Sequence, residues 1–181
     1  YLWMGAQALV GLLVLLTLGR AAIWMGVASL VLVAIYPFAK RFTWWPQLFL
    51  GFAFNWGVML AWAAHMGRVD LVPFVAWLGG IAWTIFYDTI YAHQDAEDDA
   101  LIGVKSAARL FGDDSPRILA RFTALTVALL ALAITLAGRN LLIGYAGLAL
   151  FALHLVWQLK NFQPDQSDVC LRLFRSNRDA G

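Results

Sequence analysis

Apolar residues in this chain form six long blocks separated by short polar stretches. The blocks cover Tyr1–Leu18, Ala21–Ala39, Trp44–Met66, Leu71–Ala92, Pro116–Ala137 and Leu141–Leu159. Each is close to the length of a helix that crosses the hydrocarbon core of a bilayer, about 20 residues. A helix satisfies its own backbone hydrogen bonds there, so it is the simplest spanning element. The pattern therefore predicts an all-α fold, a polytopic transmembrane helical bundle with six spans.

Short signals at the block boundaries refine this prediction. Gly19 and Arg20 alone separate the first two blocks, which predicts a tight helical hairpin. Pro116 opens the fifth block, and the preceding residues 113–115, two aspartates and a serine, are candidate N-caps. A Gly79-Gly80 pair inside the fourth block predicts close packing against a neighbouring helix.

The composition supports a membrane protein. Of the 181 residues, 62% are hydrophobic and only 13% are charged, whereas soluble domains carry about a quarter charged residues. The formal net charge of +2 is too small to indicate a nucleic-acid partner. The single cysteine, Cys170, excludes an internal disulfide, and no cysteine–histidine cluster indicates zinc.

The positions of the cations predict an orientation. Of the 13 lysines and arginines, only Arg20, Arg68 and Arg139 follow the first, third and fifth blocks, and the other ten lie toward the opposite side. Loops rich in lysine and arginine remain on the cytoplasmic side of a membrane. We therefore expect a multi-pass protein of the bacterial inner membrane or, alternatively, of the mitochondrial inner membrane, with the richer side facing the cytoplasm or the matrix.

An acidic cluster follows the fourth block on this same side. Five of the eleven acids fall within twelve residues: Asp88, Asp95, Glu97, Asp98 and Asp99. If the fourth helix continues beyond Ala92, then Asp88, Asp95 and Asp99 project from one face. Neighbouring carboxylates repel one another, and their oxygens suit Mg²⁺. The spacing alone leaves a solvated acidic loop as an equal alternative.

Cations lie near these acids in the sequence. Lys40 and Arg41 end the second block, and Lys105 and Arg109 follow the acidic cluster. Arginine grips phosphate oxygens in a bidentate manner, and lysine adds a point charge. Carboxylate-bound Mg²⁺ beside such cations is an arrangement that would hold a diphosphate.

Three stretches carry a resemblance to a known family. They are YPFAKRFTWWPQLFLGFAFNWG (36–57), YDTIYAHQDAEDDALIGVKSAA (87–108) and LRLFRSNRDAG (171–181). With them the chain resembles the UbiA superfamily of intramembrane aromatic prenyltransferases, and most closely its 4-hydroxybenzoate branch. The resemblance implies a Mg²⁺-dependent enzyme of ubiquinone biosynthesis, which transfers a polyprenyl group from its diphosphate to the ring carbon ortho to the hydroxyl of 4-hydroxybenzoate. The implied partners are polyprenyl diphosphate, 4-hydroxybenzoate and membrane lipid, with no nucleic acid.

The resemblance also implies roles for individual residues. Asp95 and Asp99 match the core of the family's second aspartate-rich motif, with Asp88 as the upstream acid and Asp98 beside them. These four aspartates are the expected metal ligands, and Asp88, Asp95 and Asp99 are the expected catalytic residues. The expected diphosphate contacts are Lys40, Arg41 and Lys105. The expected residues of the substrate pocket are Tyr36, Asn55 and Tyr91, although an amide inside a span at position 55 also fits an interhelical hydrogen bond.

The chain departs from the family in its extent. The family's first aspartate-rich motif is absent, and the six blocks correspond to the third to eighth of nine helices, with a closing helix expected after Gly181. We therefore expect residues 1–181 to form a single transmembrane prenyltransferase domain that is truncated at both ends and inactive alone. Two alternatives are another UbiA-superfamily prenyltransferase with a different aromatic acceptor and a multi-span transporter, which would place ionisable residues near the membrane midplane.

Overall fold

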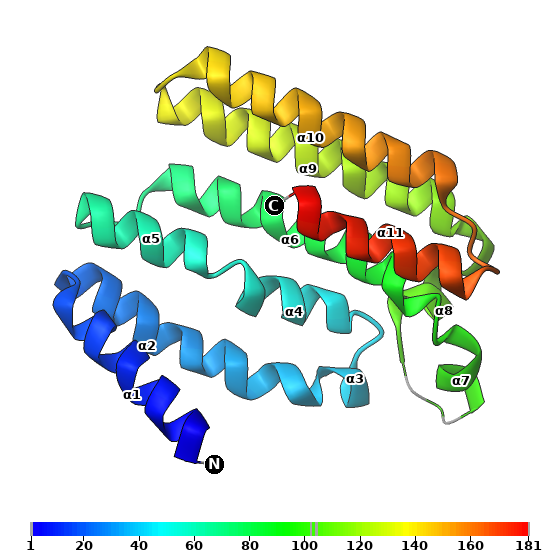
Figure 1. Ribbon diagram of the computed structural model, residues 1–181, viewed down its shortest axis with the longest axis horizontal. Coiled ribbons are helices and arrows are strands. Elements are labelled where there is room, and N and C mark those ends of the chain that lie inside the picture. Colours follow the sequence, from blue (N-terminus) through cyan, green and yellow to red (C-terminus); the bar gives the residue numbers. More distant parts are fainter. Residues whose placement is uncertain (1, 102, 104, 181) are drawn as a thin grey trace.

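The regular elements of the described chain are all helices (Figure 1). The computed structural model describes residues 2–101, 103 and 105–180, with the backbone alone at positions 40, 97, 98, 100 and 180. The prediction of an all-α helical bundle is therefore confirmed for this part of the chain.

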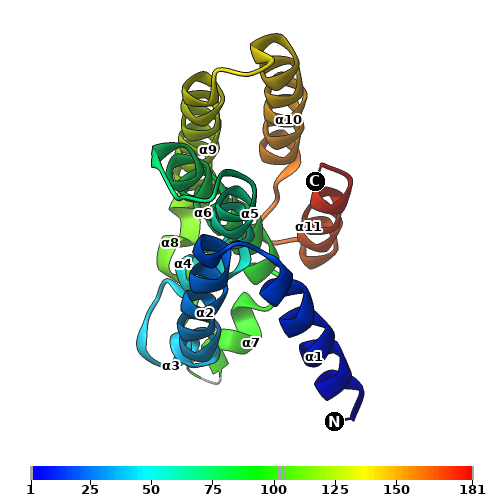
Figure 2. The same cartoon turned by 90° about the vertical axis from the view of Figure 1, so that its left-hand side faces the viewer.

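The N-terminal half consists of two apolar helices and one interrupted span. Its elements are α1 (Leu2–Thr17), α2 (Arg20–Ile35), the 3-10 turn η1 (Tyr36–Phe38), α3 (Ala39–Phe42), α4 (Pro46–Phe54) and α5 (Gly57–Met66). The third predicted span is thus broken around Asn55, whose backbone N–H still bonds the Gly51 carbonyl at 3.2 Å. No residue of α1 is buried, and this helix splays away from the others in Figure 2.

The C-terminal half contains the longest helices. Its elements are α6 (Leu71–Ala92), α7 (Ala96–Leu101), α8 (Ala107–Phe111), the 3-10 turn η2 (Gly112–Asp114), α9 (Ser115–Ala137), α10 (Leu141–Asn161) and α11 (Ser167–Ala180). Asp114 occupies the position before α9 but makes no side-chain cap, so that part of the capping prediction is wrong. Its carboxylate instead accepts a hydrogen bond from Arg117 at 3.1 Å.

Five helical stretches are long and apolar enough to cross a membrane. They are Arg20–Phe38, Pro46–Met66, Leu71–Ala92, Ala107–Ala137 and Leu141–Asn161. The first predicted block forms the shorter apolar helix α1, of 16 residues. In Figure 1 the α1–α2, α5–α6 and α9–α10 turns lie at one end of the bundle, and α3, α7 and α8 lie at the other. This alternation agrees with the two sides predicted from the cations.

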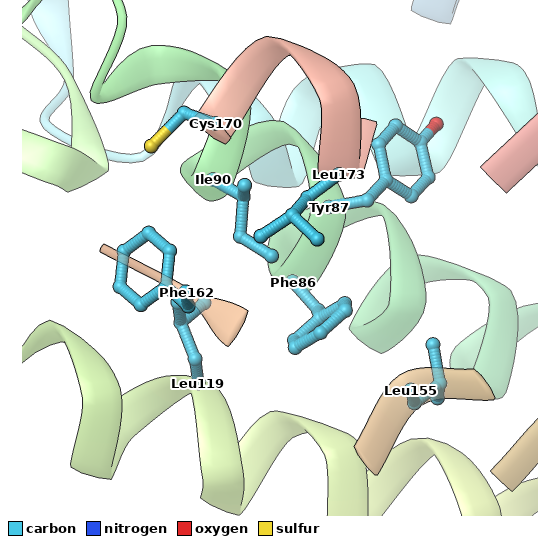
Figure 3. Packing of buried hydrophobic residues seen from close by; sticks show 8 residues of the cluster. All are labelled: Phe86, Tyr87, Ile90, Leu119, Leu155, Phe162, Cys170 and Leu173. Atoms are coloured by element: carbon cyan, nitrogen blue, oxygen red, sulfur yellow. The ribbon is translucent and has the colours of Figure 1, made fainter. Parts of the chain in front are cut away.

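Helix α6 lies at the centre and contributes the largest share of the core. Phe86, Tyr87 and Ile90 of α6 pack with buried residues of α9, α10, the α10–α11 loop and α11 (Figure 3). Small residues allow close approach, since a Cβ atom added at Gly79 would lie 2.9 Å from the Leu130 side chain of α9. The predicted close packing at the Gly79-Gly80 pair is therefore confirmed.

The last helix differs from its predicted place. Sequence analysis treated residues 171–181 as a tail on the polar side and expected the next helix after it. In the structure residues 171–180 belong to α11, which runs back along α6 and buries Cys170 and Leu173 in the core (Figure 1). Its apolar residues recur at a helical spacing, which gives α11 a core-facing side and a charged side.

Candidate functional site

The acidic motif lies where α6 ends, and the chain turns sharply there. Helix α6 stops at Ala92, and α7 begins at Ala96 after a short turn. A shared helical face for Asp88, Asp95 and Asp99 required a helix that continues beyond Ala92, and this condition is not met, whereas the predicted end of the fourth block at Ala92 is confirmed. The physical reason is a set of tertiary contacts at the helix end, which redirect the chain into the turn.

His93 supplies those contacts. Its Nδ1–H donates to the Thr89 carbonyl at 2.8 Å, so the Nε2 atom of the neutral ring accepts from the Ser115 hydroxyl at 3.0 Å. The ring also packs edge-on against Phe162, with centroids 5.1 Å apart. Burial lowers the pKa of His93 below its ordinary value of 6.5, which favours this neutral form. The imidazole thus fixes the end of α6 to the start of α9 and the end of α10.

The turn places two aspartates together. The backbone N–H of Asp99 donates to the Asp95 carbonyl at 2.8 Å, so the two residues are one helical turn apart, and both are half-buried. Asp88 lies in the last turns of α6, and the Asp98 side chain lies outside the described part of the structure. Among the described residues, no three histidine, cysteine or acidic side chains form a metal-binding group. The set of four ligands therefore stays a prediction, with Asp95 and Asp99 as its adjacent pair.

Two cations next to the motif, Lys105 and Arg109, form a cationic wall, and both contact the ring of Trp44. The Lys105 Nζ atom lies 5.9 Å, and the Arg109 guanidinium carbon 5.4 Å, from the centre of the Trp44 ring. Arg109 also donates to the Asp99 carbonyl at 3.2 Å. The segment before α4 therefore meets the segment around α8 through cation–π contacts. From the sequence, Trp44 at a span end fits an aromatic belt at the membrane interface, and its contact with Lys105 and Arg109 appears only in the structure.

The other predicted diphosphate contacts are at the same end of the bundle. Arg41 belongs to α3, is exposed, and lies over the Phe38 ring at 6.0 Å. Figure 1 shows α3 at the end of the bundle that also carries α7 and α8. The Lys40 side chain lies outside the described part of the structure, so its predicted contact remains untested.

The predicted pocket residues lie in three separate parts of the chain: Tyr36 in η1, Asn55 in the break between α4 and α5, and Tyr91 in α6. The η1 turn that carries Tyr36 lies directly before α3. The Tyr91 ring packs against Phe174 of α11, with centroids 4.5 Å apart. The Asn55 amide donates to the Thr84 hydroxyl at 2.8 Å, which confirms the interhelical hydrogen bond.

Asn55 also lines a cavity of about 500 Å³ between α4, α6 and α11. Aromatic rings form much of its wall: Phe54, Trp83, Tyr87 and Phe174. The Tyr87 ring centroid lies 5.4 Å from that of Trp83 and 5.8 Å from that of Phe174. Such a cavity fits an aromatic ring or an isoprenoid chain, and its ring faces can stabilise a nearby cation.

Two arginines of α11, Arg175 and Arg178, also line this cavity. Sequence analysis placed both in a basic tail, because the sequence gives no sign that α11 turns back along α6. Asn177, between them, accepts a hydrogen bond from the Trp83 indole at 3.2 Å and one from the Gln158 amide at 2.9 Å. These contacts fix the orientation of α11 against α6 and α10.

Comparison with known proteins agrees with this arrangement. Residues 1–178 match the model of the UbiA prenyltransferase family. The chain belongs to this family.

Several curated relatives carry the same name. The chain is 43% identical to the mitochondrial 4-hydroxybenzoate polyprenyltransferase of Rattus norvegicus, over the whole chain and 48% of the relative. It is 44% identical to that of Drosophila pseudoobscura pseudoobscura, over 99% of the chain and 45% of the relative. It is 42% identical to that of Arabidopsis thaliana, over 97% of the chain and 43% of the relative. The chain thus spans about half the length of the curated relatives it matches. No solved structure matches the chain with significant similarity.

Proposed function

We propose that the complete gene product is a membrane-embedded 4-hydroxybenzoate polyprenyltransferase of ubiquinone biosynthesis. It moves a polyprenyl group from its diphosphate to the ring carbon ortho to the hydroxyl of 4-hydroxybenzoate. The observation that carries this proposal is that Arg109 donates to the carbonyl of Asp99, one turn from Asp95, and lies with Lys105 over the Trp44 ring. Tyr87, in the last turns of α6, lines the aromatic cavity. The names of the relatives supply the acceptor and the donor.

The acidic pair fits a hard divalent cation. Mg²⁺ keeps several waters and commonly binds through one or two carboxylates together with substrate phosphates. Asp95 and Asp99, one turn apart and half-buried, provide two such carboxylates. We propose that they hold Mg²⁺, with Asp88 and Asp98 as further ligands. A bound Mg²⁺ supplies positive charge that stabilises the departing diphosphate.

The residues of the chain perform the remaining tasks. Lys105, together with Lys40 and Arg41, binds the diphosphate, and Trp44 holds Lys105 and Arg109 beside it. The allylic carbon–oxygen bond breaks with both electrons on the diphosphate oxygen. The ring carbon of the acceptor then forms the new carbon–carbon bond and releases its proton. Tyr87, Trp83 and Phe174 exclude water and face the prenyl cation with their rings, which stabilises it without capturing it.

The location follows from charge and hydropathy. Five long apolar helices and the alternating turns support a multi-pass membrane protein. We propose that the motif faces the side with more cations, which is the cytoplasm of a bacterium or the matrix of a mitochondrion. Membrane lipid then surrounds the exposed apolar faces of α1 and α2.

The test is a transfer assay with the complete gene product in lipid nanodiscs. We expect polyprenyl transfer to 4-hydroxybenzoate, loss of transfer with EDTA, and recovery with Mg²⁺. Homogentisate and 1,4-dihydroxy-2-naphthoate serve as competing acceptors, and their preferential use would assign the protein to a different branch of the family. Solute uptake into proteoliposomes without any transfer would instead favour a transporter.

A further inference from the structure

We propose that Arg175 and Arg178 of α11 bind the carboxylate of the aromatic acceptor and so select an acidic ring. This inference rests on the proposed function and adds residues to the site that lie outside the aspartate motif. Both arginines line the aromatic cavity, and they are three residues apart, so they lie on one face of α11.

Both side chains are exposed in this structure, yet they lie at a depth along the bundle that is unusual for arginine. Asn177, next to Arg178 in the chain, bonds Trp83, which is the thirteenth of the 22 residues of α6. Trp83 therefore lies near the middle of this candidate span, about 14 Å from its end at a rise of ~1.5 Å per residue. Ionisable side chains at such depth are rare in membrane proteins and commonly mark substrate sites.

These arginines form few ion pairs with the acidic residues that the structure describes. Arg175 makes no ion pair with any residue that the structure describes. Among the described residues, Arg178 forms an ion pair with its exposed neighbour Asp179 alone, at 3.2 Å, with 88% and 69% of the two side chains accessible. An exposed pair of this kind contributes little and exchanges readily. Both guanidinium groups are therefore available to an anionic ligand in the cavity.

The geometry of the reaction indicates which anion this is. The diphosphate binds at the motif, beyond the end of α6, so the attacked carbon must lie at the motif end of the cavity. Since attack occurs ortho to the hydroxyl, the para carboxylate points away from the motif and deeper into the bundle. Tyr87 and Trp83 are one turn apart on α6, about 6 Å along its axis, which is close to the length of a hydroxybenzoate ring with its two substituents.

A buried carboxylate requires a paired charge, and arginine offers one in a bidentate geometry. The aromatic walls hold the ring, and the guanidinium groups at the level of Asn177 bind the acid. A neutral phenol would offer the two guanidinium groups no opposite charge. The pair thereby accounts for selection of an acidic acceptor over a neutral ring of the same shape.

The experiment compares Arg175→Gln and Arg178→Gln with Arg172→Gln in the complete gene product. Arg172 is an exposed arginine one turn earlier on α11 and does not line the cavity, so it is the matched control. We expect the KM for 4-hydroxybenzoate to rise about 10-fold or more in each cavity variant. The KM for polyprenyl diphosphate, and transfer to neutral 4-hydroxybenzamide, should change less than about 3-fold, as should all values in the control.

Equilibrium binding of radiolabelled 4-hydroxybenzoate without the donor gives a second readout and should weaken by a similar factor. Arg175→Lys and Arg178→Lys retain the charge, so they replace the glutamine variants if those fail to fold. Variants that bind 4-hydroxybenzoate as the control does would overturn the inference, as would a rise in the KM of the donor alone. If the wild-type protein transfers no prenyl group to 4-hydroxybenzoate, the proposed function itself fails.

Discussion

The core cluster reaches the end of α6, and the acidic motif begins directly after it, yet different interactions stabilise the two regions. The core cluster consists of Phe86, Tyr87, Ile90, Leu119, Leu155, Phe162, Cys170 and Leu173, most of them fully buried. Beyond Ala92, the motif contains half-buried acids that are held by hydrogen bonds and cation–π contacts. Packing therefore fixes the scaffold as far as the end of α6, and polar contacts position the chemistry beyond it.

Because of this difference, substitutions only a few residues apart should affect either the stability of the protein or its transfer activity. A side chain of the motif should affect transfer with little effect on unfolding, because it fills no space in the core. Substitution of a core side chain should lower the free energy of unfolding with little effect on transfer. His93 and the Gln158–Asn177 pair lie between these extremes, since they are polar groups that join helices.

The largest expected effect is on the motif. Asp95→Asn removes one negative charge from the proposed metal site, and transfer should fall by about 10²–10³-fold, while the melting temperature stays within error. Asp113→Asn is the matched control, because Asp113 is an exposed acid at the same end of the bundle. A normal transfer rate in Asp95→Asn, measured in nanodiscs with saturating substrates, would contradict the proposed metal site.

The next effect tests the core. Leu155 is fully buried, so Leu155→Ala should lower the free energy of unfolding by about 2–4 kcal/mol through loss of packing and creation of a cavity. Transfer per folded molecule should be unchanged. Leu150→Ala on the same helix serves as control, since Leu150 is 71% exposed and should lose almost nothing. Equal destabilisation by both substitutions would show that α10 does not pack as described.

The buried amide pair tests how polar groups join α10 to α11. Gln158→Leu removes the two hydrogen bonds between the Gln158 and Asn177 amides, while Asn177 keeps its bond from Trp83, and the change should cost about 1–3 kcal/mol. The double variant with Asn177→Leu should recover part of this loss, because both buried polar groups are then absent. Additive losses in the double-mutant cycle, followed by thermal unfolding, would exclude coupling between the two side chains.

The smallest effect concerns the turn itself. His93→Phe removes the hydrogen bond to Ser115, and it should destabilise the protein by about 1 kcal/mol. Since the turn positions Asp95, transfer should also fall, although less than in Asp95→Asn. His65→Phe is the control, because His65 is exposed near the end of α5. A loss of stability with no change in transfer would mean that the turn keeps its geometry without the imidazole.

Much of the fold could be predicted because its signals are local. Apolar blocks of bilayer length predict spanning helices, and the uneven distribution of cations predicts their orientation. The acidic cluster at 88–99 could be seen in the sequence, and the resemblance of residues 87–108 to the family's motif identified it. Its geometry could not, because α6 could have continued past Ala92. The helix stops there through contacts of His93 with Ser115 and Phe162, which are distant in the sequence.

The sequence by itself determined the class of protein, the helical elements, the polar end of the bundle and the aspartates of the motif. Hydropathy, spacing and charge carry this information, because each depends only on neighbouring residues. The tertiary structure decided that Trp44 carries Lys105 and Arg109, that Asn55 bonds Thr84, and that α11 brings two arginines to an aromatic cavity. Each of these depends on how helices from separate parts of the chain pack, and packing depends on the shapes of side chains that meet only in the folded bundle.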